Sequence, residues 1–334
     1  MAMAPPLAGV VRLAAASRVL VLALSLLSRL LFRPYDTSAT LHPPCLSSSA
    51  TPSTSAPSTN LSAAISSLAV WDGVHFARPA ECGYEYEQSY AFLPLLPASI
   101  ALLPRSLFAP LVPVLGYGAV LVLSGLVLNN VAFVASAAYF YRLSVLILKD
   151  RKAAYRASVL FCFNPASVFY SSLYSESLYA LFSLGGLFYL FSGANTVAVI
   201  MLAISSSARS NGALNAGYFC FQALLRAYDA AVNKKRPLGS WFLEILPSQY
   251  VLFIIKASLY VDPSDSIAKI PTSVPLMKVS TRFLSASPPI YWAAAHILAS
   301  PNCTSKRWGY LICAYFIAYI LLGSLLFSNF YPFT

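Results

Sequence analysis

The chain has 334 residues, of which 58% are hydrophobic and only 10% are charged. A mean hydropathy of +0.68 excludes an ordinary soluble protein, because several apolar runs are long enough to cross the roughly 30 Å hydrocarbon core of a bilayer. The net charge of +11 does not indicate nucleic-acid binding, because no basic stripe is interleaved with aromatic residues. The sequence therefore predicts an all-α fold, a polytopic membrane helical bundle.

The first apolar segment, residues 10–32, is predicted to be a retained transmembrane helix within residues 1–33, because no small-residue cleavage site is evident. Residues 34–90 follow as a polar loop, and its part 47–62 is rich in Ser, Thr and Pro. Residues 91–334 hold the rest of the bundle, about eight to eleven helices in all. The apolar runs predict helices at about 91–104, 107–128, 131–148, 157–171, 175–192, 195–208, 213–232, 241–260, 283–299 and 309–329.

Clusters of basic residues orient this bundle. The two densest clusters, 149–152 and 234–236, are predicted to be cytosolic by the positive-inside rule. Counting helices back from the first cluster places the acidic loop 34–90 on the opposite, lumenal or extracellular side. Counting forward places the polar segments 174–177 and 209–212 on that same side. Three polar segments are thus expected to converge on one membrane face.

The loop 34–90 holds the first candidate residues. Asp72 lies between Trp71 and Phe76 at the predicted membrane surface, where burial and neighbouring charges can tune a carboxylate as a general base. The plainer interpretation is an interfacial aromatic residue followed by a solvated acid. Glu85 and Glu87 diverge on a helix, so only one of them is expected to join Asp72.

The other two polar segments supply a second acid and a cation. Glu176 lies at the start of an apolar helix, where the helix dipole favours a carboxylate and where capping alone explains much of its presence. Arg209 precedes Ser210-Asn211-Gly212, a turn that exposes backbone N–H groups, and an arginine beside such a turn is suited to clamp a phosphate. Snorkelling of Arg209 to the interface is the alternative interpretation.

In order and spacing, these motifs resemble the PIG-V family of GPI mannosyltransferases. The match extends from the first helix to about residue 228, and the tail adds similar segments at 282–296 and 330–334. The patterns that carry it are Trp71-Asp72, Gly83-Tyr84, Asn164-Pro165-Ala166, Tyr174-Ser175-Glu176 and Arg209-Ser210-Asn211-Gly212.

The resemblance implies a GT-C-type glycosyltransferase, a multi-pass enzyme of the endoplasmic reticulum membrane with its active site facing the lumen. It implies transfer of the second, α-1,6-linked mannose from dolichol-phosphate mannose to a mannosylated glucosaminyl-phosphatidylinositol acceptor in GPI-anchor biosynthesis. A β-linked donor and an α-linked product mean inversion, which needs one base and no covalent glycosyl-enzyme intermediate.

By the same likeness, Asp72 is the candidate catalytic base of this hexosyltransferase. Residues expected to bind substrate are His75, Glu85, Glu87, Glu176, Arg209 and Asn211. No metal or other cofactor is inferred, because a dolichyl phosphate is a fair leaving group unaided. An accessory membrane subunit could be a further partner.

One departure from the family leaves alternatives open. Residues 248–278 are a short, unfamiliar stretch where relatives carry a longer region, so the chain could be a catalytically inactive, truncated relative that acts as a scaffold in GPI synthesis. A polytopic lipid transporter is the other alternative, although the charges cluster at one face and no internal repeat is evident.

The six cysteines are scattered and no two of them have zinc-ligand spacing, which argues against a cysteine-based zinc site. Cys45 and Cys82 both lie in the loop 34–90, where an oxidising lumen would permit a disulfide between them.

Two N-glycosylation sequons test the predicted topology. Asn60 lies in the predicted lumenal loop and Asn302 in a predicted cytosolic one, so only Asn60 should carry a glycan. We expect endoglycosidase treatment to increase gel mobility of the chain and of Asn302→Gln, but not of Asn60→Gln. A glycan on Asn302 would contradict the predicted orientation of the C-terminal helices.

Overall fold

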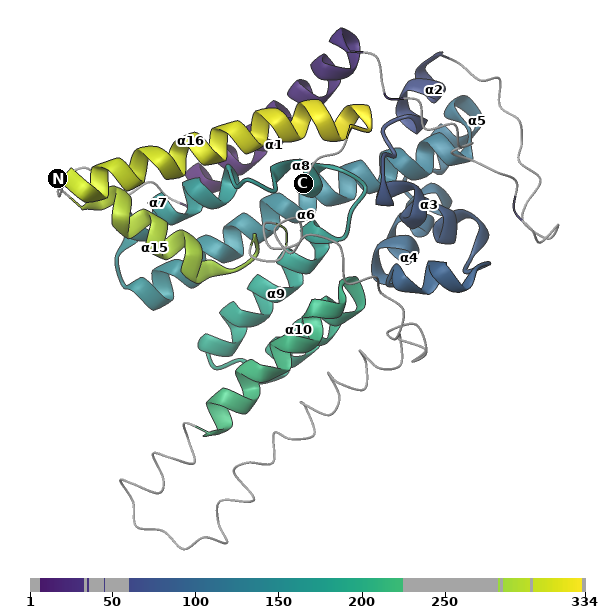
Figure 1. Cartoon of the computed structure of the whole chain (residues 1–334). Coiled ribbons are helices and arrows are strands. Elements are labelled where there is room, and N and C mark those ends of the chain that lie inside the picture. The colour runs from purple at the N-terminus through teal and green to yellow at the C-terminus, as the bar shows by residue number, and fades with distance from the viewer. Residues whose placement is uncertain are drawn as a thin grey trace, which may run out of the picture.

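A computed structural model describes residues 7–32, 35, 45, 60–224, 282, 285–300 and 303–331, and this part contains helices and no strands (Figure 1). The all-α class expected from the sequence is confirmed. The stretch 248–278 and the helix predicted at 241–260 lie outside the described residues.

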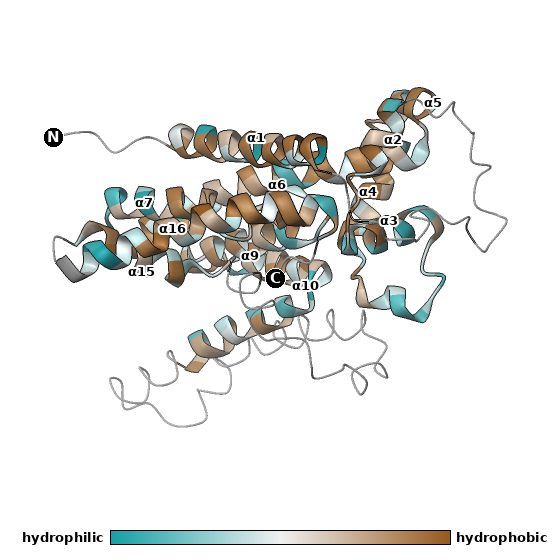
Figure 2. Ribbon diagram, turned by 45° about the horizontal axis from the view of Figure 1, so that its top comes forward, coloured by the Kyte–Doolittle hydropathy of each residue, from teal (hydrophilic) through white to brown (hydrophobic). Residues whose placement is uncertain are grey.

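Among the described residues, three helices are long and apolar enough to cross a membrane: α1 (Leu7–Leu31), α6 (Tyr117–Leu148) and α16 (Cys303–Leu326), whose apolar span is Ser305–Asn329. Figure 2 shows their apolar residues. A fourth crossing is present if the pair Leu95–Arg105 and Ala109–Leu115, bent by 69°, is one broken span. The chain is therefore a membrane protein, and its total of about eight to eleven helices stays a prediction.

Shorter helices complete the bundle. α7 (Arg151–Cys162), α8 (Ser167–Ser171) and α15 (Pro288–Ala299) pack along the long helices, while α9 (Glu176–Phe191) and α10 (Asn195–Ala208) form an antiparallel hairpin (Figure 1). At one end of α6 lie α2 (Asn60–Ser66), α3 (Asp72–Cys82), α4 (Leu95–Leu102) and α5 (Val112–Leu115). Short 3-10 turns are η1 (Glu87–Ala91), η2 (Leu103–Arg105), η3 (Ala109–Leu111), η4 (Ser210–Asn215) and η7 (Phe327–Asn329).

The prediction of separate helices at 107–128 and 131–148 was wrong, because α6 runs through that gap without a break for 32 residues. The polar pair at the gap does not end the helix, since both amides find partners. Asn129 donates hydrogen bonds to the carbonyls of Ser172 and Tyr174, and Asn130 donates to the carbonyl of Leu126. The side-chain N–H groups of both residues thus have acceptors, which makes these amides tolerable inside an apolar helix.

The helix predicted at 157–171 is divided into α7 and α8 at Asn164 and Pro165. A proline disfavours helical backbone at the residue before it and provides no N–H of its own. The single helix predicted at 157–171 is therefore two helices separated by this motif.

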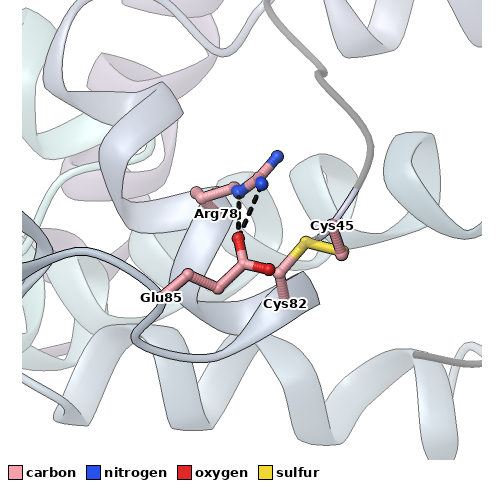
Figure 3. Close-up of a disulfide and its surroundings, with 4 residues drawn as sticks. All are labelled: Cys45, Arg78, Cys82 and Glu85. Carbon is pink, nitrogen blue, oxygen red and sulfur yellow. Dashed lines mark hydrogen bonds and ion pairs between the residues drawn. A yellow bond between two sulfur atoms is a disulfide. The ribbon is translucent and has the colours of Figure 1, made fainter. Parts of the chain in front are cut away.

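The described part of the loop 34–90 contains two helices, α2 and α3. Cys45 and Cys82 are joined by a disulfide with their Cα atoms 5.5 Å apart (Figure 3). This bond ties the chain around residue 45 to the last residue of α3. The pairing left open by the sequence is therefore present in the structure.

A buried cation joins α1 to the rest of the bundle. Arg18 is 2% exposed, and its guanidinium donates to the carbonyls of Ser167 and Cys162 at 2.9 and 3.1 Å. It also donates to the hydroxyls of Ser167 and Ser171 and lies 3.8 Å from the ring centroid of Phe133. In apolar surroundings a cation is tolerated only with such partners. Arg18 thereby holds the end of α7 and the whole of α8 against α1.

Replacing Arg18 should weaken this attachment. We expect Arg18→Met to destabilise the protein by about 3 kcal/mol, because the buried carbonyls that it serves lose their donor. Arg12→Met is the matched control, since Arg12 lies on the same helix but is exposed. Thermal unfolding in detergent should show a lower Tm for the first variant alone. Equal Tm values for both variants would contradict this role.

Candidate active site

Three segments that are distant in the sequence meet at the end of the bundle where α3 lies. Asp72 is the first residue of α3, and Arg209 directly follows α10. Both line a pocket of about 210 Å³ together with Arg282. The other residues of its wall are Phe76, Ala91, Phe92, Leu93, Ser175, Ala208, Ser210 and Asn211. All three segments expected to converge thus line one pocket, because Ser175 belongs to the segment 174–177 and Glu176 follows it in the chain.

A buried carboxylate holds the two arginines in place. Glu176 is the first residue of α9 and is 2% exposed. Its Oε1 atom lies 2.5 Å from Nη1 of Arg209 and 2.6 Å from Nη2 of Arg282, and it accepts a further hydrogen bond from Nε of Arg282 at 2.7 Å. One carboxylate therefore neutralises part of two positive charges, and charge-assisted hydrogen bonds fix both guanidinium groups.

Arg282 links this cluster to Asp72. Its Nη1 atom lies 3.7 Å from Oδ2 of Asp72, and the guanidinium carbon lies 4.5 Å from the ring centroid of Phe169 and 4.9 Å from that of Tyr174. Burial opposes the charged form of Arg282, but the negative charge of Glu176 with its hydrogen bond, and the negative charge of Asp72, outweigh this effect, so the pKa of Arg282 is raised above the ordinary arginine value. Arg282 stays a cation that faces the pocket.

The backbone on either side of Asp72 fixes its position. The Asp72 N–H donates to the hydroxyl of Tyr174 at 3.0 Å, and that tyrosine is almost fully buried. Trp71 has a φ of 52°, which is rare for a bulky residue. The surrounding contacts, including that of its ring with Phe330, offset the conformational strain. The carboxylate itself is 45% exposed. Asp72 is thus held firmly by its main chain while its side chain stays open to a ligand.

The remaining predicted site residues lie at different distances from this pocket. Asn211 lines it, and His75 stacks on Phe92 of its wall with ring centroids 5.1 Å apart. Glu85 instead pairs with Arg78 at 2.6 Å, beside the disulfide (Figure 3). Glu87 is exposed at the start of η1. The structure does not bring either of these two acids into the wall of the pocket.

Arg282 was not among the residues expected in the site. Its only signal was its place in the tail segment 282–296, which resembles the PIG-V family. It lies 106 residues from Glu176 in the chain, so no local spacing indicates their contact. Tyr174 was noted only as part of a motif, although its hydroxyl positions Asp72.

A possible ligand set for a metal lies outside the pocket. Donor atoms of Cys45, Cys82 and Glu85 lie within 4.8 Å of one another. The two sulfur atoms are joined in a disulfide, and metal binding by cysteine requires the thiolate. This group is therefore a structural crosslink beside an ion pair in the state that the structure describes.

Comparison with known proteins gives a consistent picture. Residues 7–261 and 264–334 match the mannosyltransferase (PIG-V) family. GPI alpha-1,6-mannosyltransferase 2 of Cricetulus griseus is 30% identical over 233 residues, which cover 70% of this chain and 46% of that protein. The Homo sapiens protein of the same name is 32% identical over 175 residues, or 52% of this chain and 35% of its own length.

GPI mannosyltransferase 2 of Drosophila melanogaster is 30% identical over 158 residues, covering 44% of this chain and 34% of that protein. The chain thus spans less than half the length of these curated relatives in the matched regions. No solved structure matches it. Because the family match covers nearly every residue, the chain belongs to the PIG-V mannosyltransferase family.

Proposed function

We propose that this chain transfers mannose from dolichol-phosphate mannose to a GPI precursor at the lumenal face of the endoplasmic reticulum membrane, forming the second, α-1,6-linked mannose. Membership of the PIG-V family and the names of the relatives support this activity. The observation that carries it is the pocket in which an open carboxylate, Asp72, lies beside two arginines anchored by Glu176.

Asp72 is the base in this proposal. The acceptor hydroxyl gives its proton to a carboxylate oxygen of Asp72 while the hydroxyl oxygen forms a bond to C1 of mannose. The bond from C1 to the phosphate oxygen breaks on the opposite face, and dolichyl phosphate leaves with the electron pair. One displacement inverts the anomeric configuration, which accounts for an α-linked product from a β-linked donor.

Arg209 and Arg282 stabilise the charge that grows on the phosphate. A phosphodiester becomes a monoester dianion as the bond breaks, and guanidinium groups match phosphate oxygens well in geometry and charge. Glu176 keeps both groups oriented before the donor arrives. The two arginines supply the positive charge that this reaction needs, so the proposed mechanism includes no cofactor.

Removing the negative charge of the base tests the mechanism. Asp72→Asn should lower mannose transfer by about 10²-fold or more, because an amide cannot accept the proton. The fold should persist, since Tyr174 contacts the Asp72 main chain. The measurement is rescue of surface GPI-anchored protein in cells lacking this activity, at matched expression. Glu81→Gln, in the last turn of the same helix, is the control and should rescue as well as the unmodified chain.

Rescue by Asp72→Asn would move the base to another residue and leave the transfer activity in place. Failure of the unmodified chain to rescue, with the protein stably present in the membrane, would overturn the proposed function itself.

A second experiment separates the structural role of Glu176 from the chemistry. Glu176→Gln should lower stability by roughly 3–5 kcal/mol and abolish transfer, because two poorly solvated guanidinium groups lose their counter-ion. The double variant Glu176→Gln with Arg209→Gln should recover part of the stability and none of the activity. Thermal unfolding and transfer assays on the same membranes give both values. Recovery of activity in the double variant would remove Arg209 from the mechanism.

A further inference from the structure

A second pocket lies next to the candidate active site, and we call it the side pocket. Its volume is about 430 Å³, roughly twice that of the active-site pocket lined by Asp72 and Arg209. It is enclosed by α9, by η4 with the helical turns that follow it, and by the residues that begin α15. Asn211, two residues after Arg209, lines both pockets. The two spaces are therefore neighbours across this single residue.

The side pocket extends away from the charged cluster along α9. Its wall includes Tyr179, Ser183 and Leu187, which lie three, seven and eleven residues after Glu176 on one face of the helix. At a rise of 1.5 Å per residue, Leu187 lies about 16 Å along the helix axis from Glu176. α9 is an apolar helix of the bundle, so this direction leads from the charged end toward the apolar interior.

Two polar side chains of this wall, Asn215 and Ser183, are hydrogen-bonded within the protein. The Asn215 amide donates to the hydroxyls of Ser183 and Ser205 at 3.3 and 2.9 Å. Apolar side chains form much of the rest of the wall, among them Leu187, Leu214 and Phe221. A space with this largely apolar and aromatic lining suits a hydrocarbon ligand better than a sugar.

The order of the charged residues indicates that the hydrocarbon ligand is the lipid attached to the leaving phosphate. Arg282 contacts both Asp72 and Glu176, and Arg209 contacts Glu176, so the ion pairs run in the order Asp72, Arg282, Glu176, Arg209. An inverting displacement places the base and the leaving phosphate on opposite sides of the anomeric carbon. The phosphate then lies on the Arg209 side, which is the side that continues through Asn211 into the side pocket.

We propose that the side pocket binds the first isoprenoid units of the donor's polyprenyl chain, next to the phosphate. This inference rests on the proposed function and adds a location for the donor lipid. The pocket enables the donor to keep its chain in apolar surroundings while the phosphate reaches Arg209. The acceptor then approaches from the Asp72 side without crossing that chain.

Gly217 offers a way to fill the side pocket. It lines the pocket, and a Cβ atom added there meets no other atom within 4 Å. Gly118 on α6 is equally open and lines neither this pocket nor the first, so Gly118→Leu is the matched control. Gly217→Leu should raise KM for dolichol-phosphate mannose about tenfold and leave KM for the GPI acceptor unchanged. Gly118→Leu should change neither value.

Direct binding provides a readout that does not need turnover. Dolichyl phosphate should bind the unmodified protein and Gly118→Leu equally, and Gly217→Leu about tenfold more weakly. Unchanged donor KM and unchanged dolichyl phosphate binding in Gly217→Leu would overturn the proposal, as would a rise in the acceptor KM alone. If Gly217→Leu lowers the Tm, Gly217→Ala replaces it in the test. The donor KM should then rise, and dolichyl phosphate binding should weaken, by a smaller factor.

The same measurements separate this inference from the proposed function. If the unmodified chain binds dolichyl phosphate with the dependence on Gly217 described above but transfers no mannose, the lipid site stands and the proposed activity fails. If it transfers mannose with no effect of Gly217→Leu, the activity stands and the lipid site is overturned.

Discussion

The carboxylate of Glu176 is the interaction on which the charged end of this bundle depends. It is buried, and alone it would be costly to remove from water. Two guanidinium groups, from segments 33 and 106 residues further along the chain, make its burial possible. In turn it determines where both arginines point, and through Arg282 it determines what lies opposite Asp72. The pocket wall therefore comes from distant parts of the sequence that share one counter-ion.

The segment that leads to Glu176 is itself held from two sides. The chain between α7 and α9 includes non-helical backbone, whose carbonyls need donors in apolar surroundings. Arg18 on α1 serves the carbonyls of Cys162 and Ser167, and Asn129 on α6 serves those of Ser172 and Tyr174. Two polar side chains within membrane-spanning helices thus stabilise the path of the chain toward the site.

Part of this arrangement could be predicted from the sequence. Apolar runs predict where the helices lie, and basic loops predict which side of the membrane each connecting segment is on. These signals placed Asp72, Glu176 and Arg209 on one face, although α6 was wrongly divided. The polarity of Asn129 suggests that the helix ends there. Its hydrogen bonds to residues distant in the sequence explain why the helix continues instead. The contacts of Arg282 and the pairing of Glu85 with Arg78 depend on chain folding that no spacing encodes.

The cluster around the pocket contains two arginines and two carboxylates, so its formal charge is zero when all four residues are ionised. In the proposed reaction Asp72 gains a proton, which leaves the cluster with one net positive charge. The phosphate gains one negative charge in the same step. The total charge enclosed by the protein is thus the same before and after transfer, and no counter-ion needs to enter or leave. Exchange of ions with water is slow and costly for a site in a membrane. A reaction that leaves the net charge of the site unchanged avoids this exchange.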